Sequence, residues 1–454
     1  MVKGKVVALF LLLIAACGQD NGRTIEGRRS DRGTEQDNLA NEVALASIEK
    51  ESSSRIPSAS ECLGRWVFNA GAGKSFAWAV PTKLRENDDA FDSLYGRFDD
   101  GTGRGSIEFV SQGLRISLAI FGPTTAALRQ SILGYRDRMN SHSLAGLQRQ
   151  LEDQLGEEKL IRGNKSLATA ETIASMESER RATERSIADI KADRYQPKIE
   201  LGVPNATAFR SDTKASNTLI RGAVTLDEHI VVFKAMLLGL AEPTAPSDIE
   251  WAKAEASIKD VVSRLRARQL HEIPRDPGLC LPYAFIKDDG RSAHKISASF
   301  RFSEDPALIY TANFETIPAG QVSLSTLIKA GGRSATGLFA RLPDGVTVTQ
   351  RLGPRSAKIG ALSAEQGGIV MKSTEAGNVW EGYYVYTGYG GRPGSQLLSG
   401  IEVEMESVLR RRYQKLQADP PPYQEAQSRY DALLESFHIR PTNATPADRS
   451  KSGK

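Results

Sequence analysis

Histidine and cysteine are scarce in this chain, and the motifs that place them in enzymes are missing. The 454 residues include three cysteines and five histidines. None of the histidines has a partner spacing typical of a metal or catalytic site; they are His142, His229, His271, His294 and His438. No HExxH motif, no Cys/His cluster and no GxSxG nucleophile elbow occurs. The sequence therefore predicts a protein that is not an enzyme, with no metal ligand and no cofactor.

Phosphate and nucleic-acid binding are also disfavoured. Residues Gly71–Ser75 read GAGKS, but the Walker pattern needs a glycine where this chain has Phe68. The 59 basic and 55 acidic residues leave a net charge of +4, with no basic stripe interleaved with aromatics. The hydrophobic share of 40% is that of an ordinary globular protein, and the length predicts two or three domains of about 100–200 residues each.

The N-terminus has the pattern of an export signal. Lys3 and Lys5 precede the apolar run Val6–Ile14, which is too short for a spanning helix. The sequence IAAC that ends at Cys17 resembles the bacterial lipobox, whose cysteine is lipidated; an ordinary signal peptide with an incidental cysteine is the alternative. Gly18 in place of Asp favours the outer membrane. We expect a lipoprotein signal peptide over residues 1–17 and a flexible tether over 18–58, which has few large apolar residues.

The body of the chain shows a weak internal duplication. Cys62–Phe68 (CLGRWVF) is echoed by Cys280–Phe285 (CLPYAF), and an amphipathic helix pattern follows each segment much later. The apolar residues of both helices step by 3, 4, 3 and 4: Trp251, Ala254, Ile258, Val261 and Leu265 in one, and Tyr423, Ala426, Tyr430, Leu433 and Phe437 in the other. Ser247 and Glu250 form a capping box. We predict domains over 59–275 and 276–442 and a disordered tail over 443–454.

Strand and helix patterns are segregated, which indicates an α+β fold with antiparallel sheets and flanking helices. Apolar residues alternate over 114–120, 296–302 and 401–405. Glu402 and Glu404 share one face of the last of these strands, where we expect a wet face or a partner contact. Residues 125–192 lack Trp and Phe and predict exposed helices inserted in the first domain, with Glu177 and Arg181 forming an i, i+4 pair.

Cys62 and Cys280 remain once Cys17 is assigned to lipid. In an oxidising compartment they can form a disulfide, but the sequence does not show that their backbones approach, so two buried thiols remain the alternative.

Scattered positions resemble the immunity proteins that protect bacteria from phospholipase effectors of the type VI secretion system, class four. They include Cys62–Trp66, Gly278–Leu281, Ala284–Ile286, Ser297–Phe302 with Asp305 and Pro306, Arg351–Gly360 leading to Ala364 and Glu365, Trp380–Gly382, Gly400–Met405, and Ile439–Pro441. The resemblance spans roughly 62–441. It departs from the family in the polar helical region and at Ala364–Gln366, where Gly-Glu-Glu is usual.

The resemblance implies a periplasmic, non-catalytic inhibitor with two domains arranged like a claw, which holds a cognate lipase effector and keeps lipid from its active site. Aromatic and arginine side chains anchor many interfaces, so we predict effector contacts at Tyr383, Tyr384, Tyr386, Tyr389 and Arg392, unless the alternating tyrosines face the core. The alternatives are a structural or assembly lipoprotein of the cell envelope, and a periplasmic hydrolase.

Overall fold

The computed structural model describes residues 59–440, apart from 72–75, 85–90, 92–93, 112, 165, 212–217, 239–245, 289–291, 319–345, 374–379, 396–397, 411–412 and 414. These residues lie in one compact unit, Ile48–Lys454. Cys17, the predicted tether and the predicted tail fall outside the described residues.

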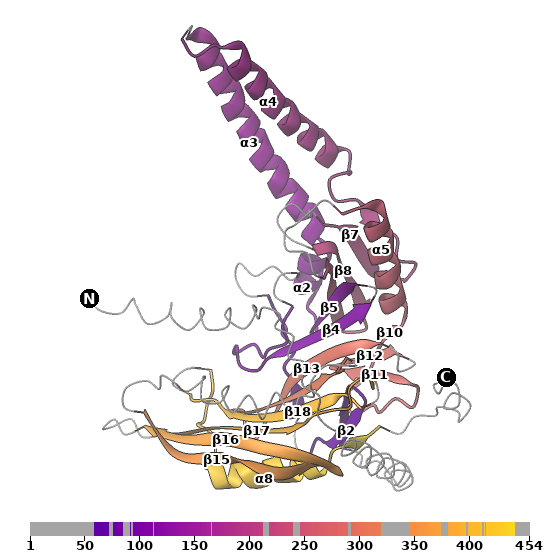
Figure 1. Ribbon diagram of the computed structural model, residues 1–454, viewed down its shortest axis with the longest axis vertical. Coiled ribbons are helices and arrows are strands. Elements are labelled where there is room, and N and C mark those ends of the chain that lie inside the picture. Colours follow the sequence, from indigo (N-terminus) through magenta and orange to yellow (C-terminus); the bar gives the residue numbers. More distant parts are fainter. Residues whose placement is uncertain are drawn as a thin grey trace, which may run out of the picture. The chain divides into compact units, whose positions relative to one another are not determined.

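One continuous antiparallel sheet contains most of the strands (Figure 1). Its order is β15-β16-β17-β18-β14-β13-β4-β5-β9-β8-β7-β6, and β3 (Phe76–Trp78) also pairs with β13. The strands of the first half are β4 (Gly105–Ser111), β5 (Leu114–Phe121), β6 (Lys198–Ile199), β7 (Ala206–Arg210), β8 (Thr218–Leu226) and β9 (His229–Leu237). Those of the second half are β13 (Ala293–Phe302), β14 (Leu308–Glu315), β15 (Val346–Ile359), β16 (Leu362–Ser373), β17 (Glu381–Tyr389) and β18 (Gly400–Ser407).

The two halves of this sheet repeat the same strand order. Outward from the centre, the first half runs β4-β5-β9-β8-β7-β6 and the second runs β13-β14-β18-β17-β16-β15. The first strands of the two sets pair with each other, with Ile107 opposite Ile296. The fold is therefore α+β with a duplicated, antiparallel architecture. The predicted claw-like arrangement stays a prediction.

Each half also begins with a short hairpin, which the other half completes. The first hairpin is β1 (Ser60–Leu63) with β2 (Trp66–Asn69), and its third strand is β19 (His438–Ile439), from the end of the chain. The second hairpin is β11 (Gly278–Leu281) with β12 (Ala284–Lys287), and its third strand is β10 (Leu265–Ala267), from the end of the first half. The predicted boundary at 275/276 thus falls between two strands of one small sheet.

A disulfide joins the two hairpins at equivalent positions. Cys62 faces Val67 in the first hairpin and Cys280 faces Phe285 in the second. The two cysteines are bonded, with Cα atoms 5.7 Å apart and a sequence separation of 218. Gly64 and Cys280 also exchange two backbone hydrogen bonds of 2.8 Å. The symmetric counterpart of this contact cannot form, because Pro282 stands where the first hairpin has Gly64 and has no N–H.

Two buried arginines hold the exchanged strands. Arg268 follows β10 and forms a fully buried ion pair with Glu61 of β1. Arg440 follows β19, and its guanidinium donates hydrogen bonds to the carbonyl oxygens of Pro274, Asp276 and Gly278. Both residues are 2% exposed. A buried charge must be paired or fully hydrogen-bonded. These contacts therefore stabilise the pairing of β10 and β19 with the hairpins of the opposite halves.

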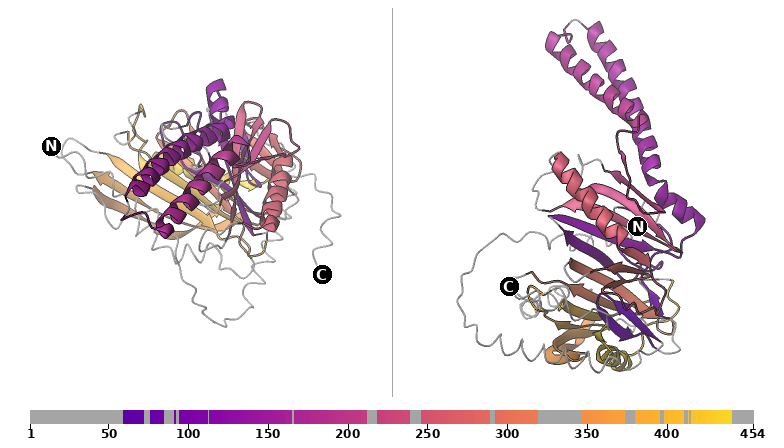
Figure 2. Two further views of the ribbon diagram at one scale, coloured as in Figure 1. Left: turned by 90° about the horizontal axis from the view of Figure 1, so that it is seen from above. Right: turned by 90° about the vertical axis from the view of Figure 1, so that its right-hand side faces the viewer.

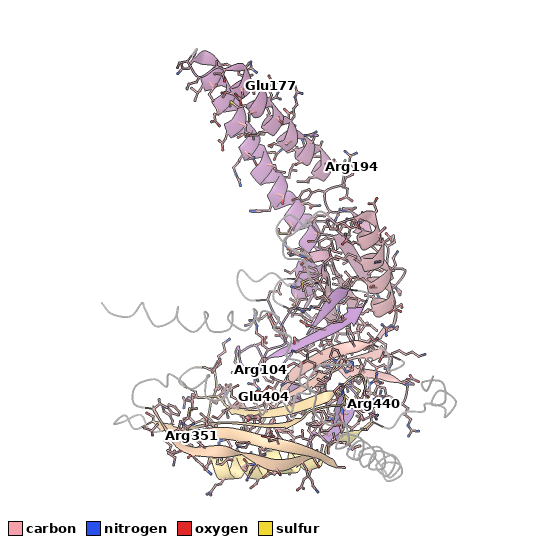
Figure 3. The ribbon with its side chains drawn as sticks, viewed as in Figure 1. Arg104, Glu177, Arg194, Arg351, Glu404 and Arg440 are labelled. Atoms are coloured by element: carbon pink, nitrogen blue, oxygen red, sulfur yellow. A yellow bond between two sulfur atoms is a disulfide. The ribbon has the colours of Figure 1, made fainter. Side chains whose placement is uncertain are left out.

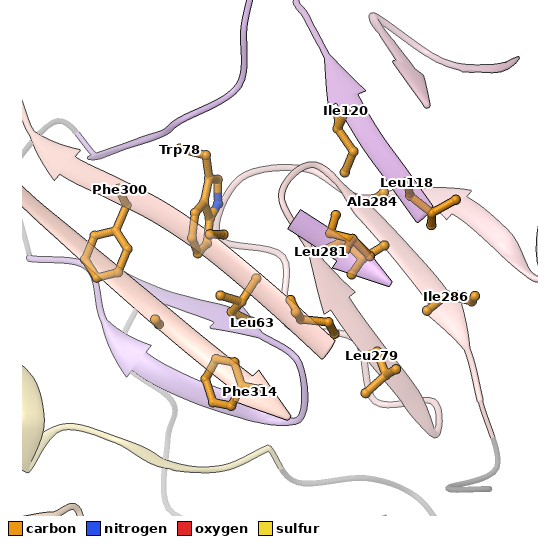
Figure 4. Packing of buried hydrophobic residues seen from close by; sticks show 14 of the residues in the cluster. Leu63, Trp78, Leu118, Ile120, Leu279, Leu281, Ala284, Ile286, Phe300 and Phe314 are labelled. Carbon is orange, nitrogen blue, oxygen red and sulfur yellow. The ribbon is translucent and has the colours of Figure 1, made fainter. Parts of the chain in front are cut away.

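The main core lies between one face of the sheet and the helices and hairpins (Figure 4). The ring of Phe68 lies 5.0 Å from that of Phe300 and 5.1 Å from that of Phe437. Helices α5 (Asp248–Ser263) and α8 (Tyr423–Glu435) pack the predicted apolar faces against the core. The last residue of each predicted face lies outside its helix, because Leu265 belongs to β10 and Phe437 follows the end of α8. The predicted capping box of Ser247 and Glu250 is confirmed.

The helices predicted over 125–192 are confirmed as α2 (Ala126–Leu133), α3 (Tyr135–Gly163) and α4 (Ala170–Lys191). Figures 1 and 2 show α3 and α4 side by side, extending beyond the sheet. They are buried only near the sheet and are linked by exposed ion pairs such as Arg162–Glu177. The predicted Glu177–Arg181 pair forms at 3.4 Å. Within the helices that are described, none combines the length and apolar character needed to cross a membrane.

The exchange of strands predicts that neither half folds alone. Fragments 59–275 and 276–442, expressed separately, should be insoluble or lack a cooperative thermal transition, because each hairpin loses its third strand and each half exposes the edge of β4 or β13. Co-expressed, they should form a 1:1 complex on size-exclusion chromatography. A sharp unfolding transition for either fragment alone would contradict the interlocked fold.

Candidate partner-binding face

Strand β17 separates the predicted tyrosines onto the two faces of the sheet. Tyr383 and Tyr389 are 1% and 9% exposed and lie in the core on the α8 side, where the Tyr383 hydroxyl donates to the carbonyl oxygen of Pro421. Tyr384 and Tyr386 are half-buried on the opposite face. Arg392 is half-buried after β17, and its backbone N–H donates to the Leu398 carbonyl. The structure therefore leaves Tyr384 and Tyr386 as the tyrosines that can meet a partner on this face.

A polar network from both halves lies beside these two tyrosines. Glu404 of β18 is 3% exposed, and its Oε2 accepts hydrogen bonds from Arg104 and, at 2.7 Å, from the Tyr384 hydroxyl. Its Oε1 accepts from Asn313 Nδ2 at 2.7 Å. Figure 3 shows Arg104, which precedes β4, and Glu404 close together although they belong to different halves. The network thus satisfies both oxygens of a buried carboxylate.

The carboxylate of Glu402, two residues earlier on the same face, has fewer hydrogen-bond partners than that of Glu404. Outside its own strand, and among the described residues, its carboxylate accepts a single hydrogen bond, from Asn313 Nδ2 at 3.4 Å. In the part of the chain that the structure describes, no lysine or arginine forms an ion pair with it. Burial, followed by the charge of Glu404, raises the pKa of Glu402 from 4.5 to about 7.

A pocket of about 370 Å³ adjoins this network. It is lined by Pro354, Arg355, Ser356, Ser363, Ala364, Glu365, Gly388 and Gly390, from β15, β16 and the end of β17. Gly388 faces Glu365 on one side and Glu402 on the other. The pocket is therefore lined by one carboxylate, Glu365, and one guanidinium group, Arg355, while Glu402 lies on the far side of Gly388.

The histidines lie apart from this face or in structural positions. His229 stacks on Tyr283 with ring centroids 4.3 Å apart, and the backbone N–H of His271 donates to Glu61. His294 is buried in β13, and burial lowers its pKa to about 4. Among the residues described, no three of His, Cys, Asp and Glu are placed to hold a metal ion.

Sequence reasoning identified the shared face of Glu402 and Glu404 but missed Arg104, Asn313 and the pocket. Arg104 lies 300 residues from Glu404, and no local pattern links the two. The pocket is lined from three strands, which local patterns do not bring together, and its lining residue Gly388 lies within β17, which continues to Tyr389.

The raised pKa of Glu402 predicts how stability depends on pH. Between about pH 4.5 and 7 the folded protein retains a proton that the unfolded chain has released, so the free energy of unfolding falls as pH rises through that window. In Glu402→Gln this fall should disappear, and at pH 8 the variant should be more stable than wild type by roughly 1–3 kcal/mol. Urea unfolding from pH 4 to 8 measures the difference.

The matched control for this prediction is Glu315→Gln, which removes a carboxylate that pairs with Lys295 on the same face. If wild type and Glu402→Gln have parallel stability curves over the whole pH range, Glu402 is not destabilised in the folded state.

Comparisons with solved structures and with family models give matches to this chain. Solved structures with a similar fold include the Tle4–Tli4 complex, at 17% identity, a TM-score of 0.44, and coverage of 84% of this chain and 97% of that one. They also include apo TplEi, an immunity protein of the T6SS from Pseudomonas aeruginosa, at 17% identity and a TM-score of 0.43, with the same coverage. TplEi complexed with "L" peptide matches at 16% identity and a TM-score of 0.40, with 84% and 98% covered.

No curated protein matches the chain. The family model for the Tle cognate immunity protein 4 C-terminal domain matches residues 272–442, a segment that runs from just before the second hairpin through α8 and β19. The predicted resemblance is thereby confirmed over residues 272–442, the segment that this family model matches.

Proposed function

We propose that this protein binds and inhibits a type VI secretion lipase or phospholipase effector and so protects the cell that makes it. The observation that carries the proposal is the family match over residues 272–442. It fits the partner-binding face, where half-buried tyrosines and a satisfied polar network are available to a protein partner and no metal cluster is found among the described residues.

Inhibition by occlusion needs no proton donor and no nucleophile. It needs a surface that keeps its shape, because ordering side chains on binding costs about 0.5–1.5 kcal/mol for each rotamer-rich side chain. The Arg104–Glu404 contact joins the two halves across this face, and Tyr384 and Asn313 hold the Glu404 carboxylate from the sides. A lipase bound at this face meets side chains that are already ordered. The protein can then block the access of substrate to the lipase without any chemical step.

The proposal includes the periplasm as the site of action and a lipid anchor at Cys17, with the outer membrane as destination. The Cys62–Cys280 disulfide supports an exported protein, since such bonds persist mainly in oxidising compartments. The lipobox resemblance and Gly18 support the anchor and its sorting.

The first test is inhibition of a cognate lipase. A lipase encoded beside this gene should co-purify with the protein and lose phospholipid hydrolysis as the protein is titrated in. Changing each of the five histidines to alanine should leave inhibition within about twofold, because no histidine is needed for a catalytic step. Ester hydrolysis by the purified protein itself, or loss of protection in a folded histidine variant, would contradict a non-catalytic inhibitor.

The second test concerns Cys17. Membrane fractions should contain the wild-type protein with the added mass of a lipid, and Cys17→Ser should move to the soluble periplasmic fraction without that mass, because the attachment sulfur is gone. Full membrane association of Cys17→Ser with an unchanged mass would show that Cys17 is not the anchor.

A further inference from the structure

Two acidic side chains flank Gly388 of β17, and this row beside the pocket is called the slot below. Glu365, Gly388 and Glu402 are successive neighbours across β16, β17 and β18. Neighbouring strands lie about 4.8 Å apart, so the two glutamates start roughly 10 Å from each other. Gly388 between them has no side chain, and the space above it forms part of the pocket of about 370 Å³.

Among the described residues, no lysine or arginine forms an ion pair with Glu365 or Glu402. Arg355, which lines the pocket, donates instead to Gln366 Oε1 at 2.9 Å. Both oxygens of Glu404 are occupied by Arg104, Tyr384 and Asn313. Glu402 has a long contact to Asn313, at 3.4 Å, a side-chain hydrogen bond with Glu404, and no salt bridge among the described residues. Burial and then the charge of Glu404 raise its pKa, and the charge of Arg104 opposes the shift.

An aromatic face completes the slot. Tyr386 lies against the backbone of Gly367, where a Cβ would come within 2.5 Å of the tyrosine hydroxyl oxygen, so the ring is held close to β16. Burial and the charges of Glu365 and Glu402 raise the pKa of Tyr386, which lies two residues before Gly388 in β17 and on the same face. Two acids and a tyrosine ring are the groups that bind a guanidinium or ammonium, through charge-assisted hydrogen bonds and cation–π contact.

We propose that this slot receives a basic side chain of the bound protein, preferably an arginine, as an anchor of the complex. The inference rests on the proposed function and assigns the contact chemistry of that same partner. An arginine fits best because its planar fork can reach two carboxylates at once while its face stacks on Tyr386. A pocket of this size, at the low end of the range for ligand sites, suits one or two side chains.

The test measures the affinity of the full-length protein for the lipase encoded beside its gene. Glu365→Gln, Glu402→Gln and the double variant keep the shape of the slot and remove its charge. Anchors of this kind dominate interface energies, so the double variant should bind about 10- to 100-fold more weakly and depend less on salt than wild type. Glu315→Gln, on the same face and paired with Lys295, is the matched control and should change affinity less than about threefold.

Two further variants separate the parts of the slot. Tyr386→Phe keeps the aromatic face and should bind nearly as wild type, whereas Tyr386→Leu should lose about tenfold. Glu365→Lys, on an exposed edge of the slot, should weaken binding more than Glu365→Gln. Thermal unfolding of every variant verifies that the fold survives.

The outcomes distinguish this inference from the proposed function. If wild type binds the lipase and the folded double variant binds within threefold of it, the basic anchor is wrong and the inhibitor function stands. If wild type does not bind the lipase at all, the proposed function fails, and the anchor fails with it.

Discussion

The pairing of β4 with β13 is the contact on which the rest of the structure depends. Each half of the chain forms six strands in the same order, and each set begins with a strand whose outer edge would otherwise be open. Open edges bind other chains, so two such sets are stable together and exposed when apart. Their pairing brings the two hairpins to the same junction, where the Cys62–Cys280 disulfide links equivalent positions and Arg104 reaches Glu404. The candidate binding face is a product of this junction.

Each half of the chain contributes its last strand to the hairpin of the other half. Strand β10 follows α5 into the second hairpin, and β19 follows α8 into the first, so the beginning and the end of the described chain stabilise each other. Arg440 lies more than 160 residues from the carbonyl groups that it binds. Such non-local contacts slow folding, because distant segments must meet before they are stabilised. These contacts also hold the two halves in a fixed arrangement. A surface that is already ordered loses less conformational entropy when a partner binds.

Local patterns of the sequence predicted much of this fold and little of its assembly. The alternation over 114–120 and the helix face from Trp251 to Leu265 were sufficient to place strands and a helix, since side-chain period depends on local geometry. The Cys-Leu openings indicated the duplication. Strand partners, the exchange of β10 and β19, and the Arg104–Glu404 contact could not be predicted, because periodicity identifies a face and not its neighbour. The same limit applies to the tyrosines: period two places Tyr383 and Tyr384 on opposite faces, but only the position of α8 shows which face is the core.

The difference between Glu402 and Glu404 points to function more directly than any motif does. The two carboxylates lie on one face of one strand, yet only Glu404 receives an arginine. A half-buried carboxylate without a cation costs folding free energy, and a glutamine of the same shape would avoid that cost. Nothing in the core requires Glu402, whose neighbours Ile401 and Val403 face the other way. A residue that weakens the free protein, and whose internal contacts are limited to Asn313 and Glu404, is understandable where a compensating charge comes from outside. On the proposal made above, Glu402 is the acid that the basic side chain of a partner would neutralise.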